Sequence, residues 1–127
     1  MKYKIVLLIM LFLVIFQGNA YAVDPKNKND LATESVICAS YATIVETCLK
    51  ERGNPILSKQ YGDLANLLFS VSTSLSNEKI TKKRFEQYNQ EIMKLIGGRC
   101  EDVTRAISKY DTQCLTLAKN VIKYSKK

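Results

Sequence analysis

The sequence predicts an all-α protein, in which residues 31–127 form a single antiparallel four-helix bundle clamped by two disulfides between its first and last helices. Apolar residues recur three and four positions apart after residue 30, which is the spacing of amphipathic helices. The same stretch has no sustained alternation of apolar and polar residues, so strands are not expected. Short links between helices favour antiparallel neighbours, and an even number of cysteines in a small exported chain favours disulfides.

The export prediction rests on residues 1–22, which have the three regions of a cleaved secretory signal peptide. Two lysines give a positive start, residues 5–16 are continuously apolar, and Ala20 and Ala22 form the small-x-small pattern of a cleavage site. The apolar run is shorter than the roughly 20 residues that a membrane-spanning helix needs. We expect cleavage after Ala22, with cleavage after Ala20 and retention as an uncleaved anchor as the alternatives.

The first predicted helix spans residues 31–52 and follows a flexible polar lead, residues 23–30. We expect Asp30 to cap the free amides of the first turn, and Glu34 to favour the positive end of the helix dipole. Gly53 supplies the stop signal. The apolar stripe of this helix consists of Ile37, Tyr41, Ile44, Val45 and Cys48.

The second predicted helix begins at Pro55 with Asn54 as its cap, a strong start signal, and its end falls within the serine- and threonine-rich residues 70–76. Gly62 weakens this helix by up to about 1 kcal/mol relative to alanine. Its apolar stripe consists of Ile56, Leu57, Leu64, Leu67, Leu68, Val71 and Leu75.

The third predicted helix covers residues 78–96, with Ser76 or Asn77 as its cap, and the Gly97-Gly98 pair ends it. Its apolar stripe consists of Ile80, Phe85, Tyr88, Ile92, Leu95 and Ile96.

The fourth predicted helix covers residues 100–124. Acidic residues lie in its first turn and Lys119 and Lys123 near its end, as the helix dipole favours. Its apolar stripe consists of Val103, Ile107, Tyr110, Cys114, Leu117 and Val121.

Helix geometry selects one of the three pairings that four cysteines permit. Within continuous helices, Cys38 lies about 15 Å from Cys48, and Cys100 about 21 Å from Cys114. Both distances exceed the roughly 7 Å limit for bridged Cα atoms, so both bonds must join the first helix to the last. Antiparallel helices then give the nested pairs Cys38–Cys114 and Cys48–Cys100. Free thiols and a metal site are the alternatives, and a zinc site is disfavoured because the chain has neither a close cysteine pair nor histidine.

The composition excludes several classes of enzyme. Without histidine, the chain cannot build a Ser-His-Asp or Cys-His nucleophile or an H-E-x-x-H metal site. Carboxylate pairs, as used in glycoside hydrolysis, are the remaining catalytic option, and none has a signature here. We therefore predict no enzymatic activity, no catalytic residue, no cofactor and no metal.

A basic cluster at the start of the third helix is the best-motivated candidate for contact with a partner. It consists of Lys79, Lys82, Lys83 and Arg84. Cations near a helix amino terminus are disfavoured by the helix dipole, which suggests a use other than stability, although a solvated face is the alternative. The formal net charge of +7 likewise fits either attraction to acidic surfaces or plain solubility.

Tyrosines are distributed over all four predicted helices, at Tyr41, Tyr61, Tyr88 and Tyr110. Such amphipathic side chains either rim the core of a small bundle or contribute to an interface with a partner.

Together these features predict a small exported protein, periplasmic or secreted, that binds another envelope protein as an inhibitor, an immunity protein or an assembly accessory would. We expect no nucleic-acid partner and no transmembrane span in the mature chain. The alternative is a carrier of a small apolar ligand or lipid, held between the helices and lined by the leucine-rich second helix.

Overall fold

The computed structural model describes residues 28–125 and is helical through almost all of that range, so the predicted all-α class is confirmed. The predicted signal peptide and residues 23–27 lie outside the described residues. The elements are α2 (Lys28–Glu51), α3 (Pro55–Leu75), α4 (Glu78–Leu95), the short 3-10 helix η2 (Cys100–Asp102) and α5 (Val103–Ser125). No helix between residues 28 and 125 has the length and apolar composition needed to span a membrane.

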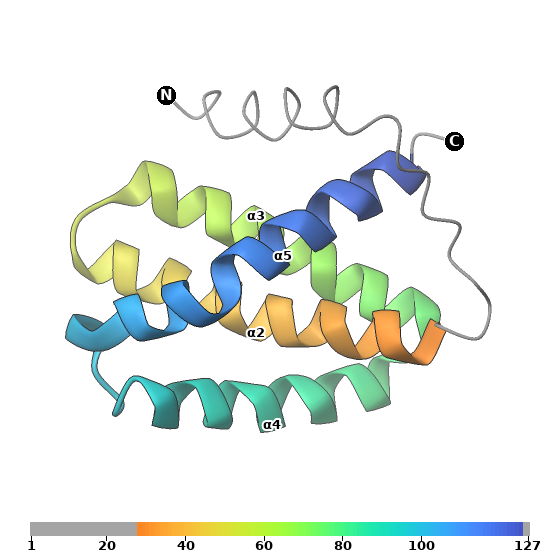
Figure 1. The fold of residues 1–127 in the computed structure, drawn as a ribbon, viewed down its shortest axis with the longest axis horizontal. Coiled ribbons are helices and arrows are strands. Elements are labelled where there is room, and N and C mark those ends of the chain that lie inside the picture. Colours follow the sequence, from red (N-terminus) through yellow and green to blue (C-terminus); the bar gives the residue numbers. More distant parts are fainter. Residues whose placement is uncertain (1–27, 126–127) are drawn as a thin grey trace.

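The helix α2 lies at the centre of the bundle and contacts each of the other three long helices. Successive helices run in opposite directions (Figure 1). The helix α5 crosses α2 and α3 diagonally, and the carboxyl end of α5 diverges from α2. Because neighbours pack on several sides of α2, its buried residues are spread around the helix rather than confined to one stripe. They include Ala32, Val36, Ala39, Tyr41, Ala42, Ile44 and Val45.

The helix ends largely follow the predicted signals. Asn54 caps α3 by accepting a hydrogen bond of 3.2 Å from the amide of Leu57, and Asn77 caps α4 through the corresponding bond of 2.9 Å. The prediction that Asp30 caps the first helix is wrong. The helix α2 already includes Lys28, so Asp30 lies within its first turn, where the helix dipole still stabilises a carboxylate.

The glycine stop signals are used as predicted. Gly53, Gly97 and Gly98 adopt positive φ angles of 75°, 60° and 68°, which a residue with a side chain rarely adopts. The last helix begins later than predicted, because Cys100 to Asp102 form a 3-10 turn and α5 starts at Val103. After the glycine pair, Arg99 has an extended backbone, and the next residue, Cys100, is bonded to Cys48 of α2. The chain therefore enters α5 through the tighter 3-10 turn.

Two predicted core positions are wrong: Ile56 is 49% exposed and Ile80 is 41% exposed. Both lie in the first turn of a helix, at opposite ends of the bundle. Apart from Leu68 and Ile92, the buried positions on α3 and α4 carry small or polar residues. The buried residues within α3 are Ser58, Ala65, Leu68 and Ser72, and those within α4 are Thr81 and Ile92. The serine, alanine and threonine side chains among them allow the outer helices to approach the central helix closely.

Both predicted disulfides are confirmed. Cys38 is bonded to Cys114 with a Cα–Cα distance of 5.3 Å, and Cys48 to Cys100 with a distance of 5.2 Å. No cysteine remains free, so the alternative of free thiols is wrong. Each bond links the central helix to the last segment of the chain, and the two bonds are nested as expected for antiparallel helices.

Candidate functional site

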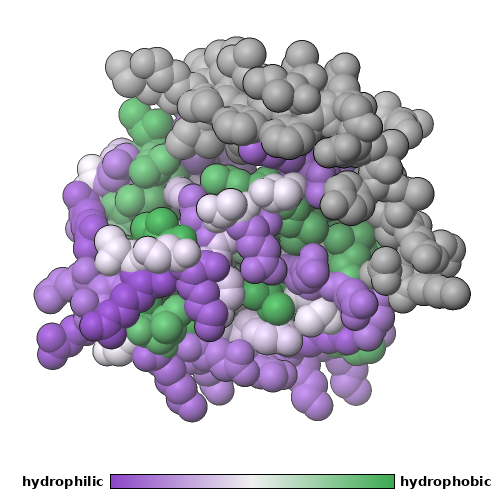
Figure 2. Space-filling view, viewed as in Figure 1, coloured by the Kyte–Doolittle hydropathy of each residue, from purple (hydrophilic) through white to green (hydrophobic). Residues whose placement is uncertain are grey.

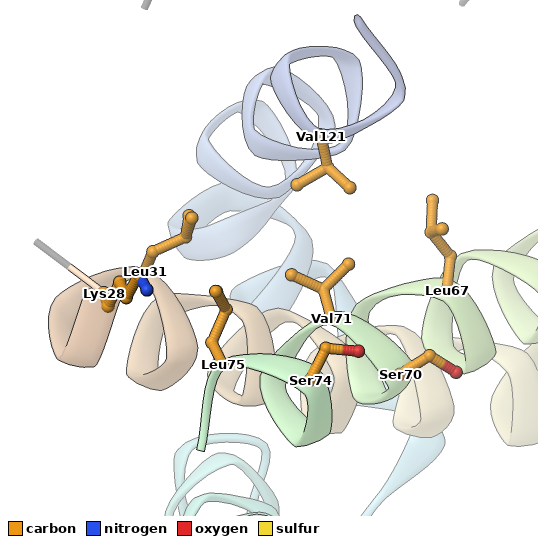
Figure 3. Close-up of a pocket in the computed structure, with 8 residues that line it drawn as sticks. All are labelled: Lys28, Leu31, Leu67, Ser70, Val71, Ser74, Leu75 and Val121. Carbon is orange, nitrogen blue, oxygen red and sulfur yellow. The ribbon is translucent and has the colours of Figure 1, made fainter. Parts of the chain in front are cut away.

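An apolar groove opens where α5 diverges from the rest of the bundle. It has a volume of about 450 Å³ and is formed by α2, α3 and α5 (Figure 3). The lining residues are Lys28 and Leu31 from α2, Leu67, Ser70, Val71, Ser74 and Leu75 from α3, and Val121 from α5.

The floor of the groove is a row of residues four apart on α3, namely Leu67, Val71 and Leu75. Residues at this spacing lie on the same face of a helix, and the row is about 12 Å long. The adjacent row, which includes Leu68 and Ser72, is fully buried in the core. The carboxyl-terminal half of α3 therefore has two faces, one packed against α2 and one open to the groove. The spacing of the apolar residues in the sequence predicts one core stripe and does not distinguish these two faces.

Polar groups are confined to one end and one edge of the groove. Figure 3 places Lys28 and Leu31 at one end and Leu67 at the other. Lys28 is exposed, and the exposed Ser70 and Ser74 line an edge formed by α3. The groove is thus an apolar channel with an ammonium group at one end, an arrangement suited to an elongated molecule with an apolar body.

A cluster of two tyrosines and one carboxylate joins the same three helices. The hydroxyl of Tyr41 on α2 donates a hydrogen bond of 2.7 Å to Oδ1 of Asp111 on α5. The hydroxyl of Tyr61 on α3 donates one of 2.9 Å to the same oxygen. The Tyr61 ring packs edge-on against Tyr41, and the Tyr110 ring lies 5.7 Å from Tyr41 between centroids. The cluster therefore fixes the position of α5 against α2 and α3.

Both hydroxyls of this cluster are held in the protonated form. Burial raises the pKa of Tyr41 above its usual value, and the hydrogen bond to Asp111 raises it further. Burial also raises the pKa of Tyr61, to about 12, with the charge of Asp111 as the next cause. Two neutral donors on one carboxylate oxygen make a structural clamp, because neither tyrosine is activated as a nucleophile or a base. Of the four tyrosines considered in the sequence, Tyr88 lies outside the cluster, half-buried on α4.

The predicted basic cluster is divided by the structure. Arg84 donates a hydrogen bond of 2.9 Å to Asn29 and so links α4 to α2. Lys82 forms an ion pair of 3.1 Å with Glu78, which offsets part of the unfavourable dipole interaction. Three exposed residues, Lys79, Lys82 and Lys83, remain as what we call the lysine face. Hydrophilic side chains predominate along the edge of the molecule where α4 lies (Figure 2).

Among residues 28–125, no group of three or more histidine, cysteine, aspartate or glutamate side chains is placed to hold a metal ion. In comparisons with known proteins, no family model, no curated protein and no solved structure matches this chain. The groove combines a concave shape, an apolar lining and a charged end, which is the arrangement typical of small-molecule sites.

Proposed function

We propose that this chain is an exported, non-enzymatic binding protein, periplasmic or secreted, and that its apolar groove holds a small apolar molecule. The signal-like residues 1–22 support export, and two disulfides are compatible with an oxidising compartment. The lack of histidine supports a binding role over a catalytic one.

The groove is the observation that carries the proposed ligand class. Its volume of about 450 Å³ falls within the range of roughly 300–1,000 Å³ typical of small-molecule pockets. Five of its lining residues are leucine or valine, contributed by three helices. Enclosing an apolar molecule there would remove from water both the ligand and the part of these half-buried side chains that is still accessible, which is favourable by about 25 cal/mol per Å² of apolar area.

Native mass spectrometry of the exported protein, purified with both disulfides intact, tests this proposal. We expect a bound small molecule that is lost on denaturation. In the variant Val71→Gln, which places an amide on the floor of the groove, the bound molecule should be missing. In the matched variant Ile56→Gln, which changes an exposed apolar residue of the same helix outside the groove, it should be retained. A wild-type protein that carries no small molecule and instead copurifies with a stoichiometric protein partner would contradict the proposal.

The lysine face supports a second candidate function, the binding of an acidic envelope protein. Lys79, Lys82 and Lys83 are exposed on an outer helix, and charge-assisted contacts of this kind mainly speed association. Replacing all three with glutamate should slow association with such a partner, most strongly at low salt, where charges are least screened. The thermal midpoint should change little, because exposed charges contribute little to stability. If the triple variant associates at the wild-type rate at every salt concentration, the lysine face is only a solvated surface.

A further inference from the structure

We infer that the ligand of the groove is a single-chain anionic amphiphile, with its tail along Leu67, Val71 and Leu75 and its anionic head beside Lys28. This inference rests on the proposed function and specifies the chemistry of the ligand. It follows from the shape of the groove and from the position of its one charged lining residue.

The shape of the groove fits one extended apolar chain. The row of apolar residues on α3 is about 12 Å long, and Leu31 and Val121 provide walls from α2 and α5. A volume of about 450 Å³ lies in the lower part of the usual range for ligand pockets. The groove therefore suits one chain lying along α3 better than a lipid with two chains.

The charge at the end of the groove selects the head group. Lys28 is the charged residue among those that line the groove, and it lies at the end opposite Leu67 (Figure 3). Asp30, in the same turn of α2, is exposed and is not among the lining residues. A carboxylate, sulfate or phosphate head at this end would meet the ammonium group, while its tail avoids water along the apolar row. A cationic head would be repelled at the same position.

Three probes with the same chain separate the contribution of the head from that of the tail: dodecanoate, dodecanol and dodecyltrimethylammonium. Dodecanoate and dodecyltrimethylammonium are titrated below their micellar concentrations, and dodecanol below its solubility limit, into the disulfide-bonded protein. We expect dodecanoate to bind most tightly and dodecyltrimethylammonium most weakly. Lys28→Glu should weaken dodecanoate binding about fivefold or more, since an exposed ion pair contributes up to about 1 kcal/mol and the reversed charge adds repulsion. The same variant should leave dodecanol binding unchanged.

Lys50→Glu is the matched control, because it makes the same charge change on an exposed lysine in the last turn of α2, about 33 Å along the helix from Lys28. It should leave dodecanoate binding within about twofold of wild type, as expected for distant exposed charges screened by salt. An equal loss in both variants would assign the preference to overall charge and overturn the inference. Equal affinities for the three probes would also overturn the inference about the anionic head. Lys28 would then act only as a cation near the negative end of the α3 dipole, and the proposed apolar site would stand. Failure of all three probes to bind would overturn both proposals.

Discussion

Asp111 shows how a single residue can fix the arrangement of three helices. One carboxylate oxygen accepts hydrogen bonds from Tyr41 and Tyr61, so α2, α3 and α5 meet at this atom. A buried polar group destabilises the fold when it has no hydrogen-bond partner, and it specifies one packing arrangement when its hydrogen bonds are made. The cluster therefore favours one position of α5 over the many that apolar packing alone would allow.

The role of Asp111 was missed in the sequence, although a signal was present. Asp111 lies four residues after Ile107 and three before Cys114, and both belong to the predicted apolar stripe of the last helix. A carboxylate within an apolar stripe requires a partner. The tyrosines were recognised as amphipathic residues, but which hydroxyls reach Asp111 depends on the packing of three helices, which no local pattern encodes.

Removing the Tyr41 hydroxyl should destabilise the bundle more than removing that of Tyr61. Tyr41→Phe deletes a buried hydrogen bond to a charged group and should lower the free energy of unfolding by about 1.5–3 kcal/mol. Tyr61→Phe should cost less, because Tyr61 is only half-buried and water can replace its hydroxyl. Tyr88→Phe, outside the cluster, serves as the control. Urea denaturation measures all three, and equal values for Tyr41→Phe and Tyr88→Phe would count against the clamp.

The raised tyrosine pKa values predict a loss of stability in alkali. In the unfolded chain a tyrosine loses its proton near pH 10, whereas folded Tyr61 keeps its proton until about pH 12 and the pKa of Tyr41 is also raised. Between these pH values the folded state binds more protons than the unfolded state, so stability is fully present below pH 10 and falls above it. Each tyrosine should contribute a slope of about 1.4 kcal/mol per pH unit. Denaturation midpoints measured from neutral pH upward test this, and Tyr41→Phe should show a shallower decline.

At the scale of the helices, start and stop signals were predictable because they are local. Asn54 with Pro55, Asn77, and the glycines after the first and third helices act as the sequence indicates. What the pattern could not resolve is which apolar residues of α3 meet the core. Leu67 and Leu68 are adjacent in the sequence, yet one lines the groove and the other is fully buried. That distinction depends on where the neighbouring helices lie.

Two glycine substitutions in this part of the fold should have opposite effects on stability. Gly62→Ala places a Cβ 2.9 Å from Cδ of Glu46, the far end of a flexible side chain that can move aside. The gain in helix propensity should then raise the free energy of unfolding by up to about 1 kcal/mol. Gly53→Ala should lower it by about 1 kcal/mol or more, because Gly53 has a φ of 75°. Thermal and urea denaturation measure both, and destabilisation by both substitutions would show that Glu46 is held rigidly.

At the scale of the whole molecule, the fold class and the disulfide pairing were both predictable. Four periodic segments with short links specify a bundle. The rise of a helix excludes disulfides within one helix, and the antiparallel direction of the first and last helices then selects the nested pairing. The diagonal course of α5 was not predictable (Figure 1). An apolar stripe indicates which face of a helix is buried but not the angle at which it crosses its neighbours. Since the groove opens where α5 diverges, the sequence indicated the leucine-rich second helix as a lining for a ligand but not the residues of α2 and α5 that complete the groove.

The two disulfides should dominate the stability of this arrangement. Each closes a long loop, with sequence separations of 76 and 52, and the chain-entropy model gives about 4 kcal/mol for a loop of this length. Replacing Cys38 and Cys114 with alanine should cost more than replacing Cys48 and Cys100, because the first pair is completely buried and leaves a cavity. Removing both pairs should abolish cooperative unfolding, since a small domain has only about 5–15 kcal/mol in total. A chain without cysteines that still unfolds cooperatively would assign the stability to the helices themselves.

The central claim, that the groove between α2, α3 and α5 is the binding site, is tested most directly by methyl-resolved NMR of the disulfide-bonded protein titrated with dodecanoate. We predict saturable shifts of the methyl groups of Leu31, Leu67, Val71, Leu75 and Val121, which line the groove. The methyl groups of Ile56 and Ile80, exposed elsewhere on the surface, should stay unchanged. Shifts confined to Ile56 or Ile80, or no saturable shift at all, would contradict the account.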